Sequence, residues 1–277
     1  MKISEVLKRA YQNVDKTEER DALFWLLLEV FDLSRSEYVI NKDKEADELL
    51  VNKYVELSDK YTNEKIAVQY LVGYSYFYGR KFFVNKDTLI PRFETEELIF
   101  RAIKYLKEYI PNKQEYKILD LGSGSGCIGI TIKMEMPNSS VTLVDNSNKA
   151  LMIVKKNQVY HDVDVKLVLS DWLNDVNERF DLIISNPPYI PVSYEVDSYV
   201  NKEPHSALYS GIEGLDSYQE ILSTIDKNLA EKALIAFEHG YDQKESLAKL
   251  VRKLIKSDKI RQEKDFNDRD RYTFIFR

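Results

Sequence analysis

The tetrapeptide Asn186-Pro187-Pro188-Tyr189 follows the apolar run 181–185 and carries the clearest chemistry in the sequence. The Asn186 side-chain oxygen and the carbonyl of Pro187 or Pro188 are hydrogen-bond acceptors, and proline fixes the backbone without a competing N–H donor. Two such acceptors can bind both protons of a planar –NH2 group, and the ring of Tyr189 can stack on that group. The tetrapeptide therefore predicts a pocket that holds and orients a planar amino group.

A glycine-rich turn follows an earlier strand and opens a helix. It comprises Gly122, Ser123, Gly124, Ser125 and Gly126, and Asp120 precedes it. Glycines allow a tight turn and a close approach of backbone to a ligand. The spacing is GxGxG and not the dinucleotide GxGxxG, and the turn lacks the Lys and Ser/Thr pair of a P-loop. We therefore expect a cofactor site for a ligand that carries no triphosphate.

Acidic residues end the next two strands, and they narrow the identity of that ligand. Asp145 can accept both hydroxyl protons of a ribose, so an adenosyl group would lie across the ends of the first two strands. Asp171 can accept an adenine amino proton, and the indole of Trp172 can cover the adenine face, with core packing as its alternative role. S-adenosylmethionine fits these groups best.

The elements that position these residues divide the chain into regions. Residues 1–72 show apolar positions three and four apart, which predicts a helical domain, and aromatic residues around Gly79 predict a β-hairpin linker over 73–90. Residues 91–277 alternate strand and helix, which is typical of a doubly wound α/β sheet. We expect strands at 116–120, 140–144, 163–169, 180–184, 233–237 and 271–276, and helices at 127–136 and 149–160.

Composition limits the protein's compartment and partners. The 277 residues carry a net charge of −6, whereas proteins that bind nucleic-acid backbones usually carry a positive excess. The single cysteine, Cys127, permits no intramolecular disulfide, and three histidines leave little for a metal site. Neither a signal peptide nor an apolar run of about 20 residues is evident. These features predict a cytoplasmic protein with no metal, no membrane segment and no direct nucleic-acid substrate. We also expect a monomer, although composition does not determine the oligomeric state.

The motifs together resemble those of the class I methyltransferases that modify planar nitrogens. Several further segments resemble the release factor glutamine methyltransferases (the PrmC/HemK family). They are 89–98, 69–73, Glu203-Pro204 with Ala207-Leu208, and Glu238-His239-Gly240. Phe93 departs from the family pattern, which commonly has proline there, so that loop is less constrained.

This resemblance implies a Rossmann-like doubly wound sheet with an antiparallel C-terminal strand and a small N-terminal helical bundle that recognises the substrate. It implies methyl transfer from S-adenosylmethionine, with S-adenosylhomocysteine as the product. The acceptor would be the glutamine side-chain nitrogen (N5) in the Gly-Gly-Gln motif of class 1 peptide chain release factors. Asn186, Pro187, Pro188 and Tyr189 would bind that glutamine and support catalysis, and Asn186 would also contact the cofactor.

Three alternatives share parts of this pattern. A ribosomal-protein glutamine methyltransferase would have the same pocket. An adenine-N6 DNA methyltransferase would also grip an amino group, but it must flip a base and hold phosphates. A non-catalytic binding module could retain the fold.

Some charged residues carry a weaker signal. Arg92 and Glu94 fit either closure over the cofactor or a surface ion pair. Histidines near Glu203 and Glu238 suggest a dyad, although packing of His239 near the end of the sheet is favoured. Lys249, Arg252, Lys253 and Lys256 share a helical face, for which solvation is favoured over binding to RNA or an acidic partner.

Overall fold

The computed structural model describes residues 1–255, 257 and 259–277, and Lys256 of the basic face therefore lies outside the described residues. The described chain forms two compact units. One contains residues 1–74 together with 196–202, and the other contains residues 75–195 and 203–277. None of the helices that the structure describes has the length and apolar character needed to cross a membrane.

The first unit is a helical bundle. Its helices are α1 (Ile3–Tyr11), α2 (Thr17–Val30), α3 (Arg35–Asn41), α4 (Glu48–Thr62) and α5 (Val68–Val72). Caps define two of these helices: the Ser34 side chain accepts from the backbone of Glu37, and Asp47 accepts from the first turn of α4. Apolar residues of α1, α2 and α4 form one core, in which Leu23, Leu26 and Leu27 have no solvent exposure.

Residues 196–202 complete this unit from far along the chain. They include a short 3-10 helix, η1 (Val200–Lys202). The Tyr199 ring stacks on Tyr61 of α4 at 4.8 Å, and its hydroxyl donates to Glu19 at 3.1 Å. The ammonium group of Lys65 lies 5.2 Å from the centre of the Tyr199 ring. Aromatic packing thus attaches this segment to the helices of the first unit.

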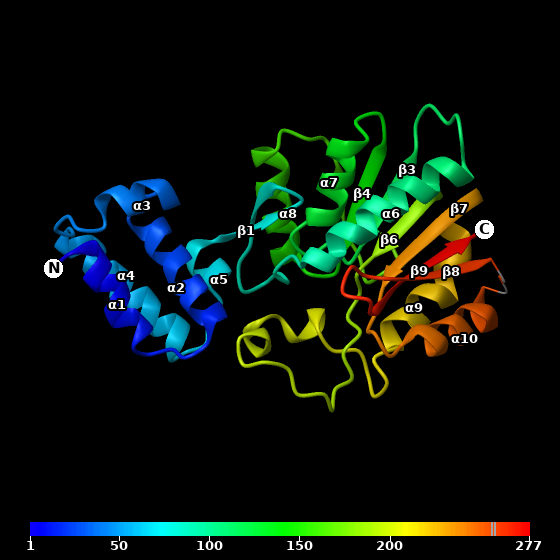
Figure 1. Ribbon diagram of the computed structural model, residues 1–277. Helices are drawn as coiled ribbons and strands as arrows, with labels where there is room; N and C mark the ends of the chain where they lie inside the picture. Colours follow the sequence, from blue (N-terminus) through cyan, green and yellow to red (C-terminus); the bar gives the residue numbers. More distant parts are fainter. Residues whose placement is uncertain (256, 258) are drawn as a thin grey trace. The chain divides into compact units, whose positions relative to one another are not determined.

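The second unit contains a seven-stranded sheet in the order β5-β4-β3-β6-β7-β9-β8 (Figure 1). The strands are β3 (Lys117–Leu121), β4 (Ser140–Asp145), β5 (Lys166–Leu169), β6 (Phe180–Ser185), β7 (Leu229–Glu238), β8 (Ile260–Lys264) and β9 (Asp270–Phe276). Strands β3 to β7 pair in parallel, and β9 pairs antiparallel with both β7 and β8. The predicted doubly wound sheet with an antiparallel C-terminal strand is confirmed.

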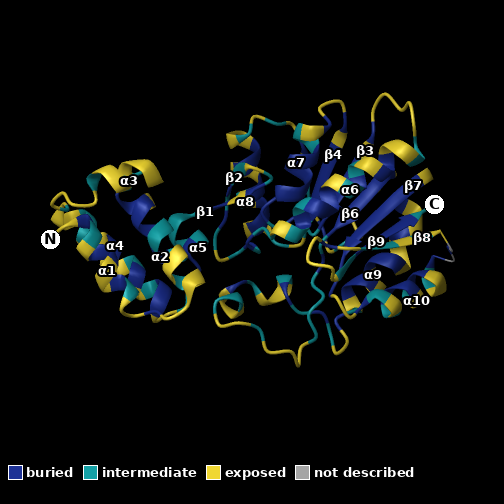
Figure 2. Cartoon of the chain, in the orientation of Figure 1, coloured by how far each residue is buried: buried dark blue, intermediate teal, exposed yellow. Residues whose placement is uncertain are grey.

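Helices cover both faces of this sheet because the inner strands are apolar on both sides. Ile118 and Leu182 belong to a core shared with α6 (Phe93–Tyr109), α7 (Cys127–Glu135) and α8 (Asn148–Tyr160). Leu119 and Ile183 point to the opposite face, against α9 (Asp216–Thr224) and α10 (Lys244–Leu254). Figure 2 shows the central strands buried and the outer surfaces of these helices exposed.

The smaller elements include one predicted feature and one that was not expected. The hairpin around Gly79 is present as β1 (Tyr74–Phe77) and β2 (Arg80–Phe83), which form a two-stranded sheet. Two more 3-10 helices, η2 (His205–Ala207) and η3 (Ile225–Asn228), flank α9. Strand β8 was not expected, because its sequence Ile-Arg-Gln-Glu-Lys is mostly polar, as an exposed edge strand can be.

Candidate functional site

A cavity of about 380 Å³ lies in the second unit, at the carboxyl ends of β3, β4 and β6. Strands β4 and β6 lie on opposite sides of β3, so the chain order reverses there, and such a crevice is where α/β sheets bind ligands. Many of the residues predicted from the sequence line this cavity: Gly122, Ser123, Gly124, Ser125, Asp145, Trp172, Asn186 and Pro188. The other predicted residues, which are Asp120, Gly126, Asp171, Pro187 and Tyr189, are not part of the lining.

The glycine-rich turn is held against β4 by backbone hydrogen bonds. The amides of Gly122 and Ser123 both donate to the carbonyl of Val144 at 2.9 Å, and the amide of Gly124 donates to Asp145 Oδ2 at 2.8 Å. Gly124 has a φ of +55°, and a Cβ added to it would meet nothing within 4 Å. The backbone here therefore faces the cavity with no side chain in the way.

Asp120 stands behind the turn and ties it to α7. Its carboxyl group is fully buried, and Oδ2 accepts a 2.8 Å hydrogen bond from the amide of Gly129 in α7. The other oxygen, Oδ1, has no partner among the described residues. Burial raises the pKa of Asp120 to about 7, against the lowering effect of the Gly129 hydrogen bond. This aspartate therefore links the end of β3, just before the turn, to the start of α7, just after it.

Helix α7 approaches the sheet closely at Gly129. A Cβ added there would lie 2.7 Å from a side-chain carbon of Leu143, which is too close for any real side chain. The absence of a side chain at Gly129 thus lets α7 begin directly over β3 and β4, with its amide facing Asp120.

Asp145 lies at the end of β4 with both carboxylate oxygens bonded to backbone. Oδ2 accepts from Gly124, and Oδ1 accepts from the amide of Ser147 at 2.9 Å. Burial is the main cause that raises the pKa of Asp145, and the backbone hydrogen bonds oppose it. Both oxygens keep lone pairs for further donors, because a carboxylate offers about four acceptor sites.

Two serine hydroxyls of the turn provide a test of what the cavity could hold. Ser123 and Ser125 both line the cavity and are buried, yet their Oγ atoms have no partner within the part of the chain that the structure describes. Asn157 in α8 fixes this turn by donating to the Ser125 carbonyl at 2.8 Å. Unpartnered buried hydroxyls beside a carboxylate fit a polar ligand such as a nucleoside.

Trp172 forms another wall, whereas Asp171 does not. A Cβ added to Gly122 would lie 3.5 Å from the indole ring, so the ring packs beside the turn. The indole N–H donates to Glu220 at 2.7 Å, and the residue has a left-handed φ of +45°. The neighbouring Asp171 is exposed and lies outside the lining.

The tetrapeptide Asn186 to Tyr189 leaves the end of β6, next to β3. The Ser185 hydroxyl donates to the carbonyl of Leu121 at 2.5 Å and fixes the start of the loop. At the other end, the side-chain amide of Gln243 donates to the carbonyls of Tyr189 at 2.9 Å and Gly214 at 3.2 Å. Both ends of the loop are thus anchored, so its prolines present a fixed backbone.

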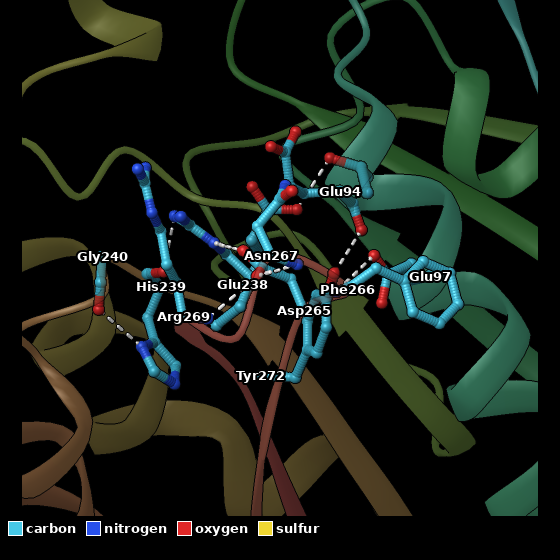
Figure 3. Close-up of polar contacts among 12 residues, drawn as sticks. Glu94, Glu97, Glu238, His239, Gly240, Asp265, Phe266, Asn267, Arg269 and Tyr272 are labelled. Atoms are coloured by element: carbon cyan, nitrogen blue, oxygen red, sulfur yellow. Dashed lines mark hydrogen bonds and ion pairs between the residues drawn. The ribbon is translucent and has the colours of Figure 1, made fainter.

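The Asn186 side chain belongs to a hydrogen-bonded chain that reaches two distant elements. Its Nδ2 donates to the Thr95 hydroxyl at 3.1 Å, and that hydroxyl donates to Glu238 Oε2 at 2.7 Å. The Tyr189 hydroxyl lies 3.4 Å from Glu238 Oε1. Glu238 is buried, and burial raises its pKa to about 7. Figure 3 shows Glu238 at the end of β7, beside Tyr272 and the first turn of α6.

Sequence reasoning assigned no role to Thr95 and considered Glu238 only as a possible dyad partner of His239. Both residues stand within segments that resemble the family, but Thr95 lies among the acidic residues that open α6, and Glu238 ends an apolar strand. Neither position shows a local spacing that links it to Asn186, because 91 residues separate Thr95 from Asn186.

Arg92 and Glu203 close the rim of the cavity. Glu203 has a buried side chain that accepts from the Arg92 guanidinium at 2.5 Å and from the amide of Ile90 at 2.9 Å. The segments on either side, which include Pro91 and Pro204, both line the cavity. Arg92 itself lines the cavity, and the ion pair that it forms is with the buried Glu203. His239 is buried, and its Nδ1 faces the Gly240 carbonyl at 2.8 Å (Figure 3).

Comparison with known proteins agrees with this architecture. Residues 98–202 match the methyltransferase small domain family. A methyltransferase from Pyrococcus furiosus has a similar fold, with a TM-score of 0.51 and 19% identity over 72% of this chain and 89% of its own. The family match over residues 98–202, together with the sheet and the cavity, defines a class I methyltransferase.

Two relatives narrow the class further. The release factor glutamine methyltransferase of Flavobacterium psychrophilum is 34% identical over 94% of each chain. The release factor glutamine methyltransferase of Bacillus cereus is 32% identical over 99% of each chain. The chain belongs to the family of release factor glutamine methyltransferases. It is an enzyme whose cofactor is S-adenosylmethionine, and the glycine-rich turn, the carboxylate of Asp145 and the unpartnered serine hydroxyls fit that group.

Proposed function

We propose that this enzyme transfers a methyl group from S-adenosylmethionine to the side-chain amide nitrogen (N5) of the glutamine in the Gly-Gly-Gln motif of class 1 peptide chain release factors. The observation that carries the proposal is a shared cavity. Asn186 and Pro188, from the loop suited to a planar –NH2 group, line the same cavity as the glycine-rich turn. The proposed acceptor is taken from the names of two relatives that match over nearly their whole length, both of which are release factor glutamine methyltransferases.

The cofactor end of the cavity would hold the adenosyl group through backbone and carboxylate groups. Asp145 is the proposed acceptor for the ribose hydroxyls, and Trp172 is the proposed wall for the adenine ring. Asp171 remains a prediction for the adenine amino group. Asp120 and Gly126 would act by shaping the turn. When bound, S-adenosylmethionine supplies a methyl group on a cationic sulfur.

The acceptor end would act mainly by orientation. A carboxamide nitrogen is a poor nucleophile because its lone pair is delocalised into the carbonyl. Asn186 Oδ1 and a carbonyl of Pro187 or Pro188 would accept its two N–H protons and fix the direction in which it faces. Positioning of this kind can lower a barrier by roughly 7–11 kcal/mol in favourable cases. Acceptors aimed at the positive charge that develops on the nitrogen add electrostatic stabilisation.

The remaining residues of the site have supporting roles in this proposal. Tyr189 would pack against the flat amide. No carboxylate among the described cavity residues is bonded to Asn186 directly, since Thr95 lies between it and Glu238. We therefore assign the loss of the product proton to water. The helical unit, residues 1–74 with 196–202, is the proposed recognition domain for the release factor.

Transfer of a labelled methyl group tests this function. The enzyme is incubated separately with a release factor, a ribosomal protein and double-stranded DNA. Label on the release factor, lost when the glutamine of the Gly-Gly-Gln motif is replaced by alanine, is the expected result. Label on the ribosomal protein or on DNA, with none on the release factor, would overturn the proposed acceptor.

A further inference from the structure

The orientation of the Asn186 side-chain amide decides whether the proposed acceptor exists. One edge of a carboxamide is an acceptor and the other edge is a double donor, and the two edges have nearly the same shape. A rotation by half a turn would present Nδ2 to a substrate –NH2 group, and two donors would then face each other. Something in the protein must therefore select one of the two orientations.

The hydroxyl of Thr95 can make this selection because it has only one proton. That proton is donated to Glu238 Oε2 at 2.7 Å, since an ionised carboxylate is an acceptor only. The Thr95 oxygen is then left as an acceptor, and it receives the Nδ2–H of Asn186 at 3.1 Å. Oδ1 becomes the remaining edge of a side chain that lines the cavity.

We propose that Thr95 and Glu238 are positioning residues that fix the Asn186 amide with its oxygen available to the substrate. The proposal rests on the proposed function, because it explains how the acceptor for the glutamine –NH2 group is set. Glu238 is not part of the cavity lining, and Thr95 lines the cavity with its hydroxyl engaged by Asn186 and Glu238, so we assign neither residue a hydrogen bond to the substrate.

The first turn of α6 is held in a way that suits this role. The Tyr272 hydroxyl of β9 donates to the carbonyl of Glu94 at 2.7 Å, and the amide of Phe266 donates to Glu97 Oε1 at 3.1 Å (Figure 3). These two contacts fix the residue before Thr95 and the turn after it. Thr95 itself is buried, so its hydroxyl has little freedom to turn away from Glu238.

The charge on Glu238 matters for the direction of the hydrogen bonds. Three elements bring polar or charged groups to the Glu238 side chain: the loop contributes Tyr189, the start of α6 contributes Arg92, Glu94 and Thr95, and β9 contributes Arg271. The Tyr218 hydroxyl of α9 donates to the backbone carbonyl of Glu238. Burial raises the pKa of Glu238 to about 7, and Thr95 and Arg271 oppose that rise. A protonated Glu238 could donate to the Thr95 oxygen and free the threonine proton. Either orientation of Asn186 would then be allowed.

Isosteric substitution of Thr95 is the first test. Thr95→Val keeps the shape and removes the hydroxyl, and kcat for release factor methylation is expected to fall by about 100-fold, as for a small misplacement of a reacting group. Cofactor affinity should be unchanged. Thr95→Ser restores the hydroxyl and should recover most of kcat. Thr131→Val makes the same chemical change in α7, at a buried hydroxyl without a partner among the described residues, and serves as the matched control.

A second variant tests the dependence on charge. In the wild type, kcat is expected to rise with pH through about 7, because the ionised form of Glu238 is required. Glu238→Gln cannot titrate, so its kcat should be lower and nearly independent of pH over the same range. A Glu238→Gln profile with the wild-type slope, or a Thr95→Val variant with wild-type kcat, would overturn the positioning role.

A measurement without substrate separates this proposal from the proposed function. The side-chain NH2 resonances of Asn186 are assigned in ¹⁵N-asparagine-labelled protein by their loss in Asn186→Ala. They should shift in Thr95→Val, stay in place in Thr131→Val, and titrate with Glu238. Should the wild type fail to methylate release factors, the function proposal fails, and these resonances still decide the positioning proposal. If the Asn186 NH2 resonances shift neither in Thr95→Val nor with pH, the positioning proposal is wrong.

Discussion

The two ends of the cavity are built from different parts of the chain. At the cofactor end, backbone amides and carbonyls of residues 122–126 and two aspartates at strand ends make the contacts. At the acceptor end, side chains from the α6 turn, the β6 loop and the end of β7 form one hydrogen-bonded chain. The first end depends on local geometry, and the second depends on the packing of the whole sheet.

This difference has consequences for the effects of mutation. Backbone contacts survive most side-chain changes, so the cofactor end is vulnerable mainly at its glycines and carboxylates. A side-chain relay fails when any one member is removed, because its neighbours lose a partner in a buried setting. Changes at the two ends should therefore separate into effects on cofactor affinity and effects on turnover.

The largest expected effect is at Asn186. Asn186→Ala removes the proposed acceptor for developing charge, and loss of one such group costs about 10²–10³-fold in kcat. Cofactor affinity should change by less than about threefold, since this end contributes little to it. Single-turnover methylation and calorimetric titration measure the two quantities. The exposed Asn174→Ala is the control, and a large loss of cofactor affinity in Asn186→Ala would contradict the separation.

The opposite pattern is expected at Asp145. Asp145→Ala removes a carboxylate that accepts from Gly124 and is proposed to hold the ribose. Hydrogen bonds to charged groups contribute about 1.5–3 kcal/mol, so the cofactor Kd should rise by about 10- to 100-fold. The kcat at saturating cofactor should be nearly retained. Asp171→Ala is the comparison variant, and its cofactor Kd should rise by less because the Asp171 side chain is exposed. An equal rise in Kd for the two variants would mean that Asp171 contributes as much to cofactor binding as Asp145.

A pair of glycines sharpens the description of the cofactor end. Gly129→Ala places a Cβ 2.7 Å from Leu143, and such overpacking should lower the free energy of unfolding by about 1–3 kcal/mol. Gly124→Ala meets no atom within 4 Å, so only its left-handed backbone is penalised, by roughly 1 kcal/mol. Urea unfolding compares the two variants. A larger loss for Gly124→Ala would mean that the turn is less open than described.

A further expected effect concerns stability and pH in the cofactor-free protein. The pKa of Asp120 is raised to about 7 in the folded state, so its contribution to stability is full below about pH 4 and is lost as pH rises through 7. Asp120→Asn should remove part of this slope, which is at most about 1.4 kcal/mol per pH unit for one group. Part remains because Glu238 acts in the same direction.

Urea unfolding at pH 5 and pH 7 measures this slope. Asp120→Asn should lose less stability than the wild type between the two values. A variant that loses as much would show that Asp120 is already ionised at pH 5.

Much of the fold was predictable because the parallel strands are nearly continuous apolar runs. The run Leu182 to Ile184 is buried on both faces, and such runs followed by turns identify inner strands from sequence alone. Strand β8 was not predicted because Arg261, Glu263 and Lys264 give it no apolar pattern. Such polar residues are tolerated because β8 lies at the edge of the sheet. Strand β5 begins at Lys166, later than the predicted start at 163, because it also lies at an edge of the sheet.

The residues of the candidate site likewise fall into those that the sequence predicts and those that depend on tertiary packing. The glycine-rich turn and Asp145 were predictable because contiguous residues and strand ends carry them. The link between Thr95 and Glu238 spans 143 residues and depends on the meeting of α6 with β7, which no spacing in the sequence reveals. The same holds for residues 196–202, whose membership of the helical unit depends on the packing of Tyr199.

That packing bears on how the protein is made. The helices of the first unit leave the ribosome early, and domains generally fold as units, amino-terminal first. Here the first unit lacks Tyr199, with its stack on Tyr61 and its hydrogen bond to Glu19, until residue 202 has been synthesised. Strands β3 to β6 are all translated before that point. The amino-terminal unit is thus begun first but completed only after four of the seven strands of the central sheet have been synthesised.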